Sequence, residues 1–405
     1  MPTFRQGHAS HPDWRTAAQL VLTQLGGSTR REPPPSNAAL GLLYVTEPFS
    51  AHLGDIAALL AKRLPGVRWV GAGAHGICVP GAEYVDEPAL AAMVCELPGD
   101  SWRIFSGLQP LPAAANDAGQ DDSSPPAAAL VHADPATPEL AELVSELAAR
   151  TGTGMLFGGL IGDGDGSSAQ LADEAVDGGL SGVAFSGGVR LLSRLTQGCA
   201  PLAREHRISD CSAHYIRELD GRPALDVLLE DLDVPAAVRH SRDGDEILRA
   251  LPTERLARGL MVGFAPGLSD KGIGFGDYTV RNLVGIDPHN RLLAVAARPQ
   301  YGDRAVFCTR DQRAARADLI RICTELREEL ETESLRVLGA HYVSCVARGE
   351  HLFGAPGAEV EIVSHNLGDI PLIGFFANGE IAGERLYGYT GILTLFVAKA
   401  PAANG

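Results

Sequence analysis

The sequence has little positive charge and no cluster of basic residues. It holds 34 lysines and arginines against 50 aspartates and glutamates, which gives a net charge of −16. Such a surface repels the phosphates of nucleic acids and the headgroups of anionic lipids. The chain also lacks any apolar run near the roughly 18–20 residues that a membrane span requires, and its first residues lack the apolar core of a secretory signal. We therefore expect neither a nucleic-acid partner nor a membrane association.

Cysteine is scarce and follows no pattern. Seven cysteines occur in 405 residues, and no two of them form a C-x-x-C pair. An odd number without regular spacing is typical of reduced thiols in the cytoplasm rather than of a disulfide framework. The cysteine usage therefore predicts a cytoplasmic location.

The sequence does contain an internal repeat. The segments "AALGLLYV" and "VRWVG" enclose an amphipathic helical stripe, and "ALVHADP" and "GMLFGGLIGDG" enclose a second one. An offset of 87 residues superposes the two copies and pairs Leu43 with Leu130 and Gly71 with Gly158. A strand, a helix and a strand in this order form a parallel βαβ unit. A third and looser copy includes Val343 and Gly374.

These copies predict an α/β protein in two halves. Residues 1–37 would form an N-terminal helix and a linker, and residues 38–236 would hold the repeated βαβ units. Residues 237–398 would form a mixed α/β half with β-hairpins, since "LVGIDPHNRLLAVAA" places turn residues between two apolar stretches.

The stretch "GAGAHG" spells G-x-G-x-x-G with Gly71, Gly73 and Gly76. A dinucleotide site needs a helix directly after these glycines, because the N-terminus of that helix holds the pyrophosphate. Here "ICVPGAEYVDEP" follows, with prolines where the helix would run. We therefore expect no dinucleotide cofactor.

Two metal-binding patterns are incomplete. A zinc site would need two tight ligand pairs, and only one pair is tight; a calcium loop would need glycine at its sixth position, where serine stands. We therefore expect no metal. The zinc pattern would use Cys199, His206, Cys211 and His214, and the calcium pattern Asp163, Asp165, Ser167 and Glu174.

Several segments resemble the FIST family (F-box and intracellular signal transduction proteins). The stretch "GFFANGEI" from Gly374 to Ile381 resembles the family signature G-F-x-x-x-G-E-I, and "TQGCAPLAREHRISDCSAHYIRELDGRPALDVL" and "SCVARG" are similar to two further family segments. The resemblance covers roughly residues 38–398. One segment departs from it, because many members carry His-Asn-x-Thr where this chain has Tyr387-Gly-Tyr389-Thr390. A role that rests on that histidine or asparagine does not transfer to this chain.

The resemblance implies a sensory module of bacterial signalling proteins that binds a small molecule, with amino acids as a proposed ligand class. It brings no established catalytic mechanism. Because only about 37 residues precede the module, we expect the signal to pass to a partner protein or through an assembly with further copies of the chain.

The ligand is expected in a cleft between the two halves, lined by glycine-rich turns and a few polar groups. A positive Arg348 and a negative Glu380 would hold the two charged ends of a zwitterion. The residues expected to contact the ligand are Gly71, Gly73, Gly158, Gly159, Gln197, Cys345, Arg348, Gly374, Phe375, Asn378, Gly379 and Glu380.

Two other functions remain open at this point. An enzyme would use Cys345 or Cys199 as a nucleophile, which requires a base or a cation beside the thiol. A scaffold would bind no small molecule and would use its acidic surface to recruit a partner.

Overall fold

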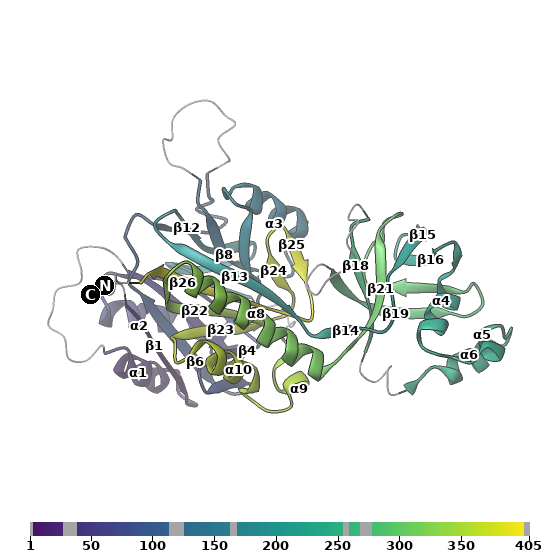
Figure 1. The fold of residues 1–405 in the computed structure, drawn as a ribbon. Coiled ribbons are helices and arrows are strands. Elements are labelled where there is room, and N and C mark those ends of the chain that lie inside the picture. The colour runs from purple at the N-terminus through teal and green to yellow at the C-terminus, as the bar shows by residue number, and fades with distance from the viewer. Residues whose placement is uncertain are drawn as a thin grey trace, which may run out of the picture. The chain divides into compact units, whose positions relative to one another are not determined.

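The computed structural model describes residues 3–26, 39–112, 125–162, 168–253, 259–267 and 278–400 (Figure 1). The chain forms two compact units. The first unit combines Met1–Thr196 with Leu319–Gly405, and the second consists of Gln197–Asp318. Among the helices in the described ranges, none is both long enough and apolar enough to cross a membrane.

The first unit contains three βαβ repeats, and in each the two strands pair in parallel. This arrangement confirms the predicted α/β class and the repeated βαβ units. The repeats are β2 (Ala39–Thr46), α2 (Leu53–Arg63) and β3 (Val67–Ala74); β8 (Ala128–Ala133), α3 (Leu140–Ala149) and β9 (Met155–Leu160); and β22 (Leu335–Cys345), α10 (Ala358–Leu367) and β23 (Leu372–Ala377).

A glycine occupies the same place in the second strand of each repeat. Gly71 lies opposite Leu43, Gly158 opposite Val131 and Gly374 opposite Tyr342. A Cβ atom added at any of the three would overlap the carbonyl oxygen of its opposite residue. Gly71 and Gly158 correspond, as the offset of the sequence repeat predicted. In the first strands the correspondence differs from that offset by one residue, because Leu43 matches Val131 rather than Leu130.

Each repeat continues into a β-hairpin that joins the sheet of another repeat. Strand β4 pairs with β23, β10 with β3, and β24 with β9, all antiparallel. Segments far apart in sequence are therefore hydrogen-bonded neighbours. The hairpins are β4 (Gly76–Val79) with β5 (Ala82–Val85), β10 (Ala169–Ala172) with β11 (Glu174–Asp177), and β24 (Glu380–Ala382) with β25 (Arg385–Tyr387).

Three sheets of six strands result from this exchange. After its hairpin, each repeat returns a strand antiparallel to its own first strand. These returning strands are β6 (Ala89–Cys95), β12 (Leu180–Phe185) and β26 (Thr390–Lys399), and the outer strands beside them are β1 (Phe4–Ser10), β7 (Trp102–Phe105) and β13 (Arg190–Gln197). One continuous apolar core holds side chains from all three sheets, among them Leu42, Phe157, Phe185, Phe375 and Phe396.

Helices complete this unit. The apolar face of α1 (Trp14–Gln24) packs in a second core with α2, and the Asp13 carboxylate caps α1 by accepting the N–H of Thr16. Residues 47–52 form a 3-10 turn (Glu47–His52) before α2, and α9 (Gly349–Phe353) follows β22. Helix α8 (Gln312–Thr332) spans the boundary between the units and buries Leu319, Cys323 and Leu326.

The second unit is a closed antiparallel barrel. Strand β18 pairs with both β19 and β21, which closes a ring of six strands and leaves no free edge among them. The ring holds β15 (His206–Ser212), β16 (Tyr215–Leu219), β18 (Leu260–Ala265), β19 (Thr279–Asp287), β20 (Leu292–Val295) and β21 (Arg304–Arg310); β14 (Cys199–Pro201) and β17 (Arg222–Pro223) flank it, with α4 (Ala224–Asp231), α5 (Ala236–Arg239) and α6 (Gly244–Ala250). An Asp-Gly turn joins β16 to β17, and Asp220 and Gly221 both have positive φ.

Candidate functional site

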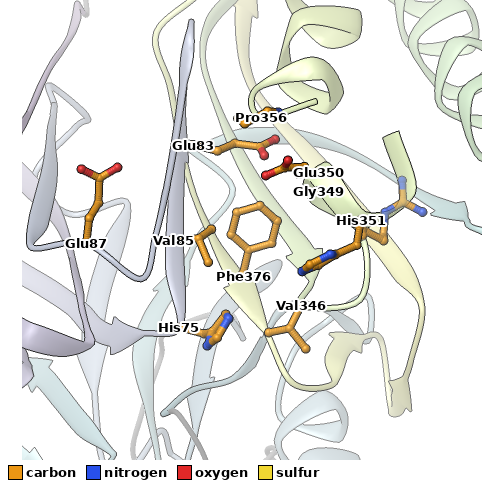
Figure 2. Close-up of a pocket in the computed structure, with 11 residues that line it drawn as sticks. His75, Glu83, Val85, Glu87, Val346, Gly349, Glu350, His351, Pro356 and Phe376 are labelled. Carbon is orange, nitrogen blue, oxygen red and sulfur yellow. The ribbon is translucent and has the colours of Figure 1, made fainter. Parts of the chain in front are cut away.

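A pocket of about 230 Å³ lies where hairpin β4–β5 meets the carboxyl ends of β22 and β23 (Figure 2). The end of a parallel strand pair is a usual place for a ligand site in α/β proteins. Phe376, Arg348 and Gly349 are buried there, whereas Glu350 and His351 of α9 are exposed at the rim. The residues that line the pocket are His75, Glu83, Val85, Glu87, Val346, Arg348, Gly349, Glu350, His351, Pro356 and Phe376.

Arg348 is the most deeply buried charge in this pocket, at 1% exposed. Its guanidinium forms an ion pair with Glu359 of α10, with Nη2 2.6 Å and Nε 2.7 Å from Oε1. Burial alone would lower the pKa of Arg348, but the Glu359 carboxylate raises it above its usual value. Nη1 is buried and has no hydrogen-bond acceptor among the described residues. Arg348 therefore remains charged and keeps one donor group free.

The Glu359 carboxylate is held from several sides. Tyr342 donates its hydroxyl to Oε1 at 2.5 Å, Ser344 donates to Oε2 at 2.9 Å, and the Gly349 N–H donates to Oε2 at 3.2 Å. A buried ion pair is stable when further hydrogen bonds satisfy its lone pairs, as here. This network fixes Arg348 at the base of the pocket.

Glu83 of β5 brings a carboxyl group to the same pocket. Its Oε1 is buried without a hydrogen-bond donor among the described residues. Burial is the main cause that raises the pKa of Glu83 to about 7. The nearby carboxylates of Glu359 and Glu350 also raise it, whereas a hydrogen bond from the N–H of Gly357 opposes the rise. Figure 2 shows the Glu83 and Glu350 side chains directed to the same region, beside the ring of Phe376.

A second buried carboxyl lies close by, in β24. Glu380 is fully buried, and its Oε2 accepts the N–H of Thr390 at 3.1 Å and the Thr390 hydroxyl at 2.7 Å. Burial raises the pKa of Glu380 to about 7, although these bonds and one to the Cys345 thiol oppose the rise. Burial, followed by the Glu380 charge, raises the pKa of Cys345 well above its usual value. The thiol is therefore protonated at neutral pH, which disfavours its use as a nucleophile.

The structure brings several of the predicted contact residues together around Glu380. Gly158 and Gly159 lie opposite Ile381 and Glu380 in the β9–β24 pairing. The carbonyl of Gly379 accepts the N–H of Leu160 at 2.8 Å, and the Asn378 N–H donates to the carbonyl of Leu160 at 3.3 Å. The predicted residues in this group are Gly158, Gly159, Cys345, Asn378, Gly379 and Glu380, and none of them lines the pocket of Figure 2.

The other predicted residues lie elsewhere. Gly71 and Gly73 belong to β3, where a Cβ on Gly73 would overlap the Ser50 hydroxyl. Gly374 pairs with Cys78 of the exchanged hairpin, and Phe375 is in the core.

Gln197 belongs to the second unit. Its N–H donates to Asp318 at 2.7 Å and its side-chain amide donates to the carbonyl of Tyr278 at 3.1 Å. Of the predicted contacts, Arg348 alone lines the pocket.

Sequence reasoning missed Glu83, Glu350, His75 and His351 as pocket residues. The C-x-x-R-G strand end pointed to Arg348, and the next residues, Gly349 to His351, follow it directly. No local signal pointed to Glu83, because it reaches the pocket only through the pairing of β4 with β23, nearly three hundred residues further along the chain.

A buried polar cluster at the centre of the first unit was also missed. The hydroxyl of Tyr44 lies 2.8 Å from Nε2 of His132 and 2.7 Å from Nε2 of His341, and the ring of Phe375 packs on all three. Burial lowers the pKa of both histidines to about 3, so both are neutral. The hydroxyl can donate to one imidazole and accept from the other, which links β2, β8 and β22, the first strands of the three repeats.

The zinc pattern of the sequence does not assemble among the described residues. His206 lies between Asp220 and Asp231, at 2.8 and 2.9 Å, and Cys199 contacts Met261. Asp163, Asp165 and Ser167 lie outside the described residues, and Glu174 begins β11. Within the described ranges, no group of three or more His, Cys, Asp or Glu side chains could hold a metal ion.

Comparison with known proteins covers most of the chain. Residues 39–222 match the FIST N domain and residues 224–383 match the FIST C domain. The chain is 27% identical to the uncharacterised protein Rv0628c of Mycobacterium tuberculosis over 400 residues, 96% of this chain and 98% of that protein. It is 32% identical to the uncharacterised protein Mb0898c of Mycobacterium bovis over 216 residues, 52% of this chain and 51% of that protein. Two matched domains that together span most of the sequence show that the chain belongs to the FIST family, whose domains are sensory domains of signal transduction.

Proposed function

We propose that this protein is a cytoplasmic sensor that binds a small polar metabolite in the pocket beside Arg348 and passes the signal to a partner protein. The binding site is then within the first unit rather than in a cleft between two halves. Its volume of about 230 Å³ is below the roughly 300–1,000 Å³ of pockets for drug-sized ligands, which favours a compact metabolite.

One observation carries this proposal. Arg348 Nη1 and Glu83 Oε1 are buried polar atoms of opposite kind, they belong to two residues of one pocket, and neither has a hydrogen-bond partner among the residues that the structure describes. A buried polar group without a partner costs roughly 1–3 kcal/mol, so a ligand that supplies both partners gains that free energy. An amino acid carries both groups, with a carboxylate for Arg348 and an ammonium for Glu83.

Two of the other predicted residues, Cys345 and Phe375, are chain neighbours of residues that line the pocket. Cys345 is the last residue of β22 and directly precedes Val346. Phe375 lies in β23, directly before Phe376. Arg348 and Glu380 were expected to clasp a zwitterion, but Arg348 is already paired with Glu359. Glu83 is therefore the better partner for the positive end of the ligand.

An enzyme that uses Cys345 is the second candidate function, because Glu380 accepts a hydrogen bond from that thiol. The raised pKa of Cys345 and its near-complete burial speak against nucleophilic attack in the free protein. Cys199 is fully buried and contacts a methionine sulfur, so its surroundings offer less still.

The experiment is a thermal-shift screen of the full chain against a metabolite library, with mass spectrometry of the recovered compounds. A sensor gains stability as RT ln(1 + [L]/Kd) and returns its ligand unchanged. We expect Glu83→Gln to weaken the apparent affinity derived from the thermal shift at least tenfold. The control is Glu361→Gln, at an exposed residue of α10 outside the pocket, which should leave this affinity unchanged. If a chemically altered compound is recovered, and the Cys345→Ser variant no longer produces it, the protein is an enzyme instead. If no compound shifts the thermal transition, the scaffold is the function that remains.

A further inference from the structure

The charges around the pocket are unbalanced. The guanidinium of Arg348 is neutralised by Glu359, so it adds no net positive charge. Three further carboxyl groups line the pocket, those of Glu83, Glu87 and Glu350. The groups that can oppose them are the imidazoles of His75 and His351. A small molecule that enters therefore meets an excess of acidic groups.

The acidic groups are not equivalent. Glu87 accepts a hydrogen bond from the Ser10 hydroxyl at 2.8 Å, and Figure 2 shows its side chain apart from the others. Figure 2 shows Glu83, from the hairpin, and Glu350, from α9, beside the ring of Phe376. The face of an aromatic ring attracts a cation as carboxylates do, by about 0.5–2 kcal/mol. Carboxylates and an aromatic ring together form a site for an ammonium group.

Two carboxyl groups in one partly dry site do not both ionise easily, because like charges repel strongly at low dielectric. Glu83 lies near the carboxylates of Glu350 and Glu359, and among the described residues its Oε1 has no donor to stabilise a negative charge. Below about pH 7, Glu83 of the empty pocket is therefore mostly protonated. The raised pKa of Glu83, about 7, agrees with this geometry.

We propose that the pocket binds its ligand through an ammonium group that replaces a proton on Glu83, so that binding releases one proton. This inference rests on the proposed function and adds the cationic group of the ligand and its dependence on pH. The exchange is balanced: the neutral Glu83 carboxyl and a protonated amine give a carboxylate–ammonium pair and one proton, which passes to the buffer. No other co-reactant is needed.

Selectivity follows from this exchange. A compound in which a hydroxyl replaces the amine has no positive charge to pair with Glu83, so it leaves the carboxyl protonated. We expect 2-amino acids to bind at least tenfold more tightly than the matching 2-hydroxy acids. Affinity for the amine should rise about tenfold per pH unit below about 7 and level off above it, because the proton on Glu83 competes with the ligand.

The test is isothermal titration of the full chain with the set of proteinogenic amino acids and their 2-hydroxy analogues. Titrations at each pH in two buffers that work there and differ in ionisation enthalpy, MES and Bis-Tris at about pH 6 and Tricine and Tris at about pH 8.5, give the number of protons released. We expect close to one proton at about pH 6 and close to none at about pH 8.5. Glu83→Gln should abolish the release, Glu350→Gln should shift it to lower pH by removing a like charge, and Glu361→Gln should leave it unchanged.

The outcomes separate this inference from the proposed function. Binding of an amino acid without proton release, or equal binding of its hydroxy analogue, would overturn the proton exchange and leave the sensor. If no compound of either set binds, while the metabolite library stabilises the protein, the ammonium site is wrong and the pocket takes another class. If neither set nor library binds, the proposed function itself fails.

Discussion

Glu83, Glu380 and His206 show how burial acts on single side chains in opposite directions. The two glutamates lose hydration with few compensating donors, and the pKa of each rises to about 7. His206 is 4% exposed, but each ring nitrogen faces a carboxylate, Asp220 at 2.8 Å and Asp231 at 2.9 Å. Burial alone would lower the pKa of His206, and the two aspartates raise it above 6.5. The histidine is therefore an internal cation of the second unit.

This ion pair predicts how stability depends on pH. The folded-state pKa of His206 is raised, so its contribution is complete below the unfolded value of 6.5 and is lost as pH rises through the folded value. His206→Ala should lower the free energy of unfolding by about 1.5–3 kcal/mol near pH 6 and by less at higher pH.

Denaturant unfolding at several pH values measures this difference, with the exposed His214→Ala as the control. A loss that grows with rising pH would contradict a protonated His206.

The accessibility of the cysteines gives a second prediction for single side chains. Six of the seven cysteines are buried, and Cys211 is partly exposed. We expect an alkylating reagent to modify Cys211 first in the folded protein, and Cys345 only after denaturant is added. Mass spectrometry of peptides after timed alkylation measures the order, and rapid labelling of Cys345 at neutral pH would favour the thiol enzyme.

The βαβ repeats were predictable because their sequence signals are local. Apolar strands, helical stripes and glycine turns recur in the first two copies, and each copy folds as a parallel pair. The hairpin exchange was not predictable, because β4, β10 and β24 each pair with a strand from a different repeat. Strand β1 was missed as well, since "FRQGHAS" is mostly polar and is ordered by pairing with β6.

The glycine of each repeat gives a prediction for these elements. A Cβ on Gly71 would overlap the carbonyl oxygen of Leu43, and a backbone atom cannot rotate away as a side chain can. Gly71→Ala should therefore lower the free energy of unfolding by about 3 kcal/mol or more. Gly107→Ala is the matched control, because a Cβ there would meet nothing within 4 Å. Equal stability of the two variants would refute a packing role for the repeat glycine.

The chain forms two units with separate apolar cores. The barrel packs its own apolar cluster around Ile216, Leu228 and Phe307, and the three repeats share another. We expect the units to unfold in distinct transitions, so that His206→Ala shifts the transition of the barrel and Gly71→Ala that of the repeats. Hydrogen exchange with mass spectrometry, resolved by peptide, follows both. A single transition shifted equally by both variants would contradict this independence.

Of the candidate site, the sequence predicted Arg348 and the strand ends around it. It could not predict Glu83, whose place depends on long-range strand pairing, nor the pairing of Arg348 with Glu359, which lies one helix further on. The family resemblance predicted a sensory module, and the matched domains confirm the family. The pocket is the location that we propose for the ligand.

A crystal structure of the full chain with the compound that stabilises it most tests the proposed binding site directly. We predict ligand density in the pocket of Figure 2, with an acceptor group within hydrogen-bond distance of Arg348 Nη1 and a cationic group beside Glu83. Density at Cys345 and Glu380, or within the barrel, with the pocket left empty would contradict it.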